Sequence, residues 1–95
     1  MSEDTLEVLI GYNVEIGIPD RAFCTMIEII EEYGNSNYLN EAAMAEIVTT
    51  TMMLWQEGCH IKKAINDALR KLGYNKLGSN HKQFNEDEYY DGRIR

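Results

Sequence analysis

Apolar residues recur at helical spacing on both sides of a glycine in the stretch 38–73. Before Gly58, three- and four-residue steps join Ala43, Met44, Ile47, Val48, Thr51, Leu54 and Trp55. After Gly58, the same steps join Ile61, Ala64, Ile65, Ala68, Leu69 and Leu72. This spacing gives each helix one apolar stripe, so the pattern predicts two packed helices, at about 40–57 and 59–72.

Residues that favour helix ends support these two helices. Asn40 is a good N-cap, and Gly58 and Gly73 suit the left-handed residue that follows a helix. The weak point is Thr49-Thr50-Thr51, because consecutive β-branched residues lower helix propensity and threonine hydroxyls can bond back to the preceding turn. We therefore expect packing to hold this segment.

The N-terminal segment shows a different pattern, a strict alternation of apolar and other residues. The apolar positions are Leu6, Val8, Ile10, Tyr12, Val14, Ile16 and Ile18. A period of two indicates a β-strand, yet no other strand is predicted in the chain to pair with it. A three-residue turn at Gly11-Tyr12-Asn13 lets the strand fold on itself, with the other six apolar residues of this set on one face. The sequence therefore predicts a β-hairpin at about 5–18.

Two alternatives for this segment stay open. It could pair with a second copy in a two-stranded ribbon across a homodimer, as in ribbon-helix-helix proteins, although the outward Glu7 and Glu15 argue against DNA reading by such a ribbon. It could instead form a short helix capped by Asp4, with Glu7 completing a capping box. The second alternative makes the fold all-α.

Pro19 and Asp20 predict the start of another helix, at about 20–33, which ends before Gly34. After Gly73 the periodic pattern is lost, so residues 76–95 are predicted to be an irregular, polar, acidic tail on a compact domain of residues 1–75. The expected fold class is α+β and mainly helical, with a hairpin, three helices and a tail.

Composition limits the cellular setting. The 95 residues, 44% hydrophobic, suit a single domain. The N-terminus is acidic where a signal peptide would be basic, and no apolar run is long enough to cross a bilayer. These features predict a cytoplasmic protein with no membrane partner.

Charge is divided unevenly along the chain. Residues 1–57 hold eleven acids and one base, a net of −10; residues 58–82 hold six bases and one acid, a net of +5; residues 83–95 hold four acids and two bases, a net of −2. The three values sum to the overall −7. The last predicted helix is therefore basic within an otherwise acidic protein.

The sequence contains no recognisable catalytic motif, and we expect no enzyme activity and no cofactor. The candidate zinc ligands Cys24, Cys59, His60 and His81 match no standard spacing, so no metal site is predicted. The two cysteines are expected to be reduced thiols in the core.

Two functions follow from the charge pattern. The first is a non-enzymatic interaction module, regulatory or inhibitory, whose acidic surface binds a basic, nucleic-acid-handling partner protein; small acidic inhibitors from phages and mobile elements share this size and composition. That surface would comprise Glu7, Glu15, Glu28, Glu31 and Glu32. The alternative is a DNA-binding regulator in which 40–57 and 59–72 form a helix-turn-helix that contacts DNA through Lys62, Lys63, Asn66 and Arg70.

Overall fold

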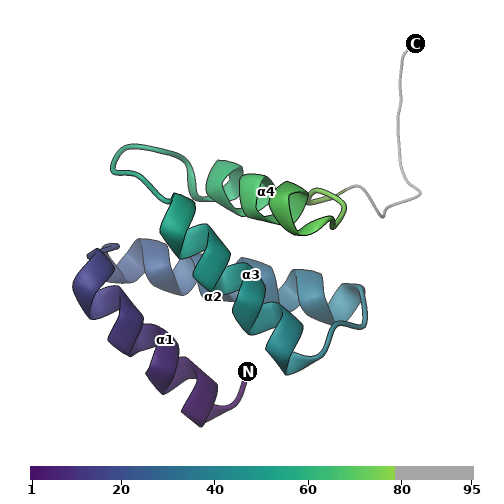
Figure 1. The fold of residues 1–95 in the computed structure, drawn as a ribbon, viewed down its shortest axis with the longest axis horizontal. Helices are drawn as coiled ribbons and strands as arrows, with labels where there is room; N and C mark the ends of the chain where they lie inside the picture. The colour runs from purple at the N-terminus through teal and green to yellow at the C-terminus, as the bar shows by residue number, and fades with distance from the viewer. Residues whose placement is uncertain (79–95) are drawn as a thin grey trace.

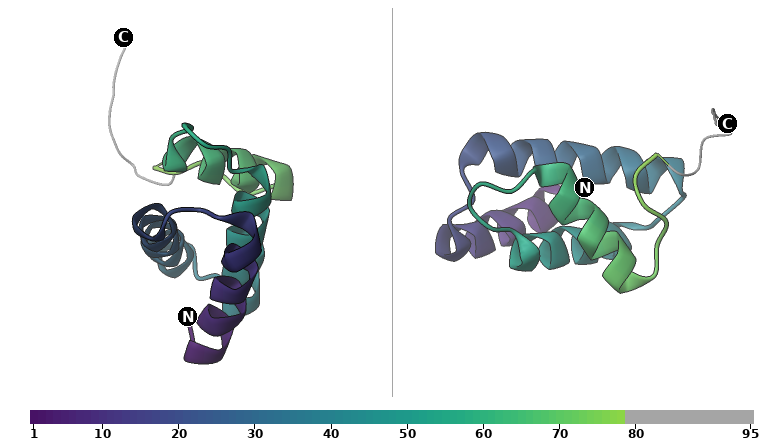
Figure 2. Two further views of the ribbon diagram at one scale, coloured as in Figure 1. Left: turned by 90° about the vertical axis from the view of Figure 1, so that its left-hand side faces the viewer. Right: turned by 90° about the horizontal axis from the view of Figure 1, so that it is seen from above.

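The computed structural model describes residues 1–78, which form four helices and no strand (Figure 1). They are α1 (Glu3–Ile16), α2 (Asp20–Ser36), α3 (Glu41–Leu54) and α4 (Ile61–Leu72). Helix α3 is central, because its backbone approaches all three other helices, whereas the backbone of α1 approaches α3 alone. Figures 1 and 2 show α1 and α4 on different sides of α3. The all-α alternative is thus confirmed.

The predicted β-hairpin at 5–18 is wrong, since this segment is the helix α1. The alternative of a two-stranded ribbon shared between two copies is wrong for the same reason. A helix pairs its backbone N–H and C=O groups within itself, whereas a strand needs a neighbour that the described part of the chain does not supply. The alternation of apolar residues therefore does not make this segment a strand. In the helix, it distributes the apolar side chains over several sides.

Residues at both ends of α1 define where the helix starts and where it stops. The Ser2 hydroxyl accepts a hydrogen bond from the Thr5 backbone N–H at 3.3 Å, which makes Ser2 the N-cap in place of Asp4. At the other end Gly17 adopts φ +88°, a left-handed conformation that glycine accepts without strain. Pro19 then precedes α2, which begins at Asp20 as predicted.

Asn13, placed by the hairpin prediction in a turn, lies instead in the buried stripe of α1. Its side-chain amide donates from Nδ2 to the Ile18 carbonyl at 2.8 Å, and its Oδ1 accepts from the Ile18 backbone N–H at 3.0 Å. Both backbone groups of buried Ile18 are thereby satisfied, and the link between α1 and α2 is held in one conformation.

The core forms where the stripes of α2, α3 and α4 meet. Helix α4 buries Ala64, Ile65, Ala68 and Leu69 against its neighbours, as its spacing predicted. The threonines of α3 bond back to the preceding turn, with the Thr51 hydroxyl donating to the Ile47 carbonyl at 2.7 Å and the Thr49 hydroxyl to the Ala45 carbonyl at 3.1 Å. Packing around buried Thr51 holds a segment of low intrinsic propensity.

Two helix ends differ from the prediction because glycines were taken as stop signals. Helix α2 continues through Gly34 to Ser36, and Gly34 is buried where a side chain would overlap Met44. Helix α3 ends at Leu54, and Gly58 lies in the following loop with φ +90°. The first glycine serves close packing between α2 and α3, and the second serves a turn.

Residues 74–78, part of which was assigned to the tail, pack back on the helices. The Tyr33 hydroxyl donates to the Asn75 carbonyl at 2.6 Å, and burial, followed by the neighbouring Tyr74, raises the pKa of Tyr33. The Leu77 backbone N–H donates to the Asn66 side-chain Oδ1 at 2.8 Å. The remainder of the predicted tail, 79–95, lies outside the described residues.

Candidate interaction surfaces

Helix α1 leaves most of its apolar residues exposed. Val8, Ile10 and Tyr12 are each 53% exposed, and Val14 is 79% exposed. Only Leu9 and Asn13 of this helix are buried. Alternating apolar residues spread around a helix with a period of 3.6, so one neighbour cannot cover them all, and apolar side chains remain on both flanks of the buried stripe.

One flank of α1 faces α2 across a groove of about 510 Å³. Its apolar lining comes from Leu6 and Ile10 of α1 and from Phe23 and Ile27 of α2. The remaining lining residues are Asn13, Asp20, Cys24 and Glu28. We call this the α1–α2 groove. It combines an apolar floor with two exposed carboxylates and contains no basic side chain.

The other flank of α1 lies along α3, and the two helices run side by side in the same direction (Figure 1). Val8 and Tyr12 line a hollow with alanines of α3 and with Glu46, and the hollow continues past Thr49 to Ile16 and Met53. We call this the α1–α3 flank. Met53 is 79% exposed at its far end, so apolar surface extends along much of α1.

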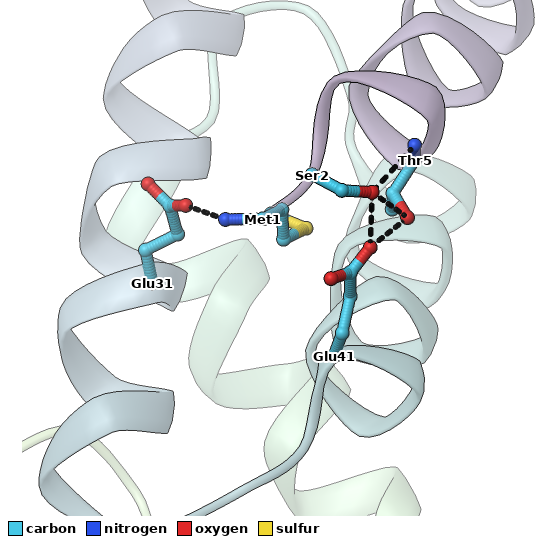
Figure 3. A network of polar contacts seen from close by, with 5 residues as sticks. All are labelled: Met1, Ser2, Thr5, Glu31 and Glu41. Carbon is cyan, nitrogen blue, oxygen red and sulfur yellow. Dashed lines mark hydrogen bonds and ion pairs between the residues drawn. The ribbon is translucent and has the colours of Figure 1, made fainter.

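The N-terminal end of α1 is fixed by a polar cluster, shown in Figure 3. The Glu41 carboxylate at the start of α3 accepts hydrogen bonds from the Ser2 hydroxyl at 2.6 Å and from the Thr5 hydroxyl. These bonds, with Ser2 contributing most, lower the pKa of Glu41. On the other side the Met1 amino group forms an ion pair with Glu31 of α2.

The five glutamates predicted as one acidic surface do not form one site. Glu7 and Glu15 are exposed on α1, and Glu28 is exposed at the rim of the α1–α2 groove. Glu31 is engaged by the Met1 amino group, and Glu32 lines a separate hollow beside Leu77. The structure therefore places Glu28 beside an apolar groove and assigns Glu31 to holding α1 in place.

Three of the four alternative DNA-binding residues make contacts within α4 or just after it, and the fourth, Lys62, is exposed. Lys63 and Arg70 both pair with Asp67, at 3.2 and 3.1 Å, and Asn66 uses its Oδ1 to hold Leu77. Helix α3 ends at Leu54 and α4 begins at Ile61, so the six residues 55–60 separate them. A helix-turn-helix joins its helices with about three or four residues.

The cysteines are free thiols, as expected, but Cys24 is exposed on α2 rather than placed in the core, and Cys59 is half-buried. Among residues 1–78 no three His, Cys, Asp or Glu side chains lie close enough to hold a metal ion. His81, one of the candidate ligands, lies outside this range. None of the described helices has both the length and the apolar character needed to cross a bilayer.

Of the residues that line the α1–α2 groove, sequence reasoning assigned only Glu28 to a binding surface and missed the apolar lining of Leu6, Ile10, Phe23 and Ile27. A signal for it was present. Ser2 with acids directly after it, and Gly17 with Pro19 after it, are helix start and stop signals around 3–16. A helical projection of that segment separates Leu6 and Ile10 from Val8 and Tyr12, on opposite flanks of Leu9.

Comparison of the chain with protein-family models, with curated proteins and with solved structures gave no match.

Proposed function

We propose that this chain is a non-enzymatic interaction module that uses the exposed side of α1 and α2 to bind a basic partner protein. The observation that supports this most is the exposure of Val8, Ile10, Tyr12 and Val14 along α1. Scattered exposed apolar residues are normal, but here both flanks of α1 line hollows, Ile10 with apolar residues of α2 and Val8 and Tyr12 with alanines of α3. Exposed apolar surface of this extent is typical of an interaction site. Glu7 and Glu15 supply exposed carboxylates on the same helix.

The sign of the partner follows from the charge around this surface. Helices α1 and α2 carry eight acidic side chains against the single base Arg21. The acids are Glu3, Asp4, Glu7, Glu15, Asp20, Glu28, Glu31 and Glu32. Complementary charge accelerates encounter and disfavours acidic partners. If the partner uses its basic surface to bind nucleic acid, occupancy of that surface by this module inhibits it.

A salt titration combined with paired charge reversals tests this function. The bait is the full chain, the prey is the proteome of the native host, and bound proteins are identified by mass spectrometry at low and high salt. The double variant Glu7→Lys, Glu28→Lys changes the proposed surface. The double variant Glu32→Lys, Glu57→Lys alters the net charge by the same amount at exposed positions outside the groove, because Glu32 lines the separate hollow beside Leu77 and Glu57 lies in the loop after α3.

The proposal expects basic partners that are retained at low salt, released as salt rises, and lost from the first variant but kept by the control. Equal retention by both variants would contradict it, as would partners that are acidic or insensitive to salt. Circular dichroism of each variant establishes that the helices remain folded. A parallel titration with mixed-sequence duplex DNA at low salt tests the helix-turn-helix alternative, which requires binding that Lys62→Ala weakens.

A further inference from the structure

We infer that the α1–α2 groove binds a basic amphipathic helix of the partner. This inference rests on the proposed function and adds the site and the chemical class of the ligand. The groove lies between two helices whose backbones stay apart, since α1 approaches α3 and not α2. A helix laid in such a groove would complete the apolar contacts that α1 and α2 do not make with each other.

The groove's lining sets the ligand's apolar face. Ile10 is half exposed, Leu6 is partly buried, and Phe23 and Ile27 are nearly covered and form the floor. Leu6 and Ile10 are one helical turn apart, as are Phe23 and Ile27, so each helix contributes two apolar side chains on successive turns. A ligand helix matches this with two or three aliphatic or aromatic side chains at three- and four-residue spacing.

The groove's rim sets the ligand's charge. Asp20 and Glu28 stand at exposed positions of α2, two turns apart, and line the groove on that side. No basic side chain lines the groove, so neither carboxylate has a cationic neighbour there. Lysine or arginine residues beside the ligand's apolar face would reach both carboxylates, which favours a basic helix over a neutral or acidic one.

This chain does not itself offer such a helix among its described residues. Its basic helix is α4, whose apolar residues Ala64, Ile65, Ala68 and Leu69 are already buried. A second copy presents α4 in the same buried state. Residues 83–95 have a net charge of −2 and would be repelled by the rim. The ligand that fits the groove therefore comes from a different protein.

The test uses a synthetic peptide of about 14 residues, roughly four helical turns, with leucines on one face and lysines elsewhere. Its controls are a peptide of the same composition in scrambled order and a peptide with glutamate in place of lysine. Binding to the full chain is measured by fluorescence anisotropy at low and high salt. We expect the amphipathic basic peptide to bind most tightly, because only it presents both an apolar face and complementary charge.

Two matched pairs of variants locate the bound peptide. Ile10 and Val8 are equally exposed on α1, but Ile10 lines the α1–α2 groove and Val8 the α1–α3 flank. Ile10→Ser should weaken binding about fivefold or more, while Val8→Ser leaves it nearly unchanged. Glu28→Lys should weaken binding about twofold to fivefold at low salt, with less effect from Glu32→Lys on another side of α2.

Each other outcome overturns the inference and separates it from the proposed function. If Val8→Ser weakens binding and Ile10→Ser does not, the ligand lies on the α1–α3 flank. If scrambled and amphipathic peptides bind equally, charge alone acts and no helix is recognised. If sedimentation shows a dimer that Ile10→Ser dissociates, the occupant is a second copy. In all three cases the proposed function still depends on the native-partner salt titration.

Discussion

Helices α1 and α4 contain similar proportions of apolar residues but place them in opposite ways. In α4 the apolar side chains follow helical spacing, and Ala64, Ile65, Ala68 and Leu69 are all buried. In α1 they do not follow helical spacing, and Leu9 is buried while Val8 and Ile10 on either side of it are half exposed. The buried stripe of α4 is fully packed within the domain. Helix α1 leaves most of its apolar residues exposed in the described part of the chain.

The two helices also differ in what attaches them. Helix α4 packs against both α2 and α3 through its apolar stripe. Helix α1 relies on Leu9, on the Asn13 amide bonded to Ile18, and on the polar cluster around Glu41. Few buried apolar contacts mean a low free energy of local opening. We therefore expect hydrogen exchange to be faster in α1 than in α4.

The largest effect should come from the core contact of α4. Leu69→Ala removes a fully buried side chain and should lower the free energy of unfolding by about 2–5 kcal/mol. Val14→Ala, at the most exposed apolar position of α1, should change it by less than about 0.5 kcal/mol. Urea denaturation of both variants measures the difference. Similar costs would mean that α1 is buried as fully as α4.

A smaller effect should follow from loss of the Asn13 amide. Asn13→Ala leaves the backbone N–H and carbonyl of buried Ile18 without their partners, and we expect a loss of about 1–3 kcal/mol. The change should also speed hydrogen exchange in α1 more than in α4. An equal increase in hydrogen-exchange rates in both helices would show that α1 does not open separately from the rest of the domain.

The two glycines inside helices should respond in opposite directions. Gly11→Ala on exposed α1 meets open space and should raise the free energy of unfolding by about 0.5–1 kcal/mol. Gly34→Ala in α2 places a methyl group against the Met44 side chain and should lower it by about 1 kcal/mol, because overpacking outweighs the gain in helix propensity. Thermal denaturation compares the two. A double-mutant cycle with Met44→Ala should remove the cost at position 34; an unchanged cost would exclude Met44 as its source.

The smallest effect should be the pH dependence that Glu41 contributes. Its pKa is lowered in the folded protein, so its hydrogen bonds stabilise the fold above the ordinary glutamate pKa of about 4.3 and are lost as the pH falls through the lower folded value. Glu41→Gln should therefore weaken the acid-induced loss of stability. Melting temperatures of both proteins across the acidic range measure this. Parallel curves would show that the Ser2 and Thr5 hydroxyls do not bind the carboxylate.

The candidate site was predicted only in part. Of the residues predicted for an acidic surface, Glu7 and Glu15 are exposed on α1 and Glu28 is exposed on α2. The α1–α2 groove was not foreseen, because it depends on how far the two helices stand apart. That spacing depends on the short link between α1 and α2, which Asn13 holds through Ile18. It also depends on long-range contacts of the N-terminal end of the chain with Glu41 of α3 and Glu31 of α2.

The sequence by itself determined the stripe of α4, most of the stripe of α3, the start of α2 and the division of charge, because each depends on nearby residues and a fixed helical period. In α3 the predicted Leu54 is exposed and Met52 is buried instead. Tertiary structure decided that 3–16 is helical, that Gly34 is a packing position and that Ile10 lines a groove. The physical reason is the same in each case. A strand needs a second strand to pair with, Gly34 is required only because another helix packs against it, and the exposure of Ile10 depends on which helix lies beside it. All of these are contacts between different segments of the chain.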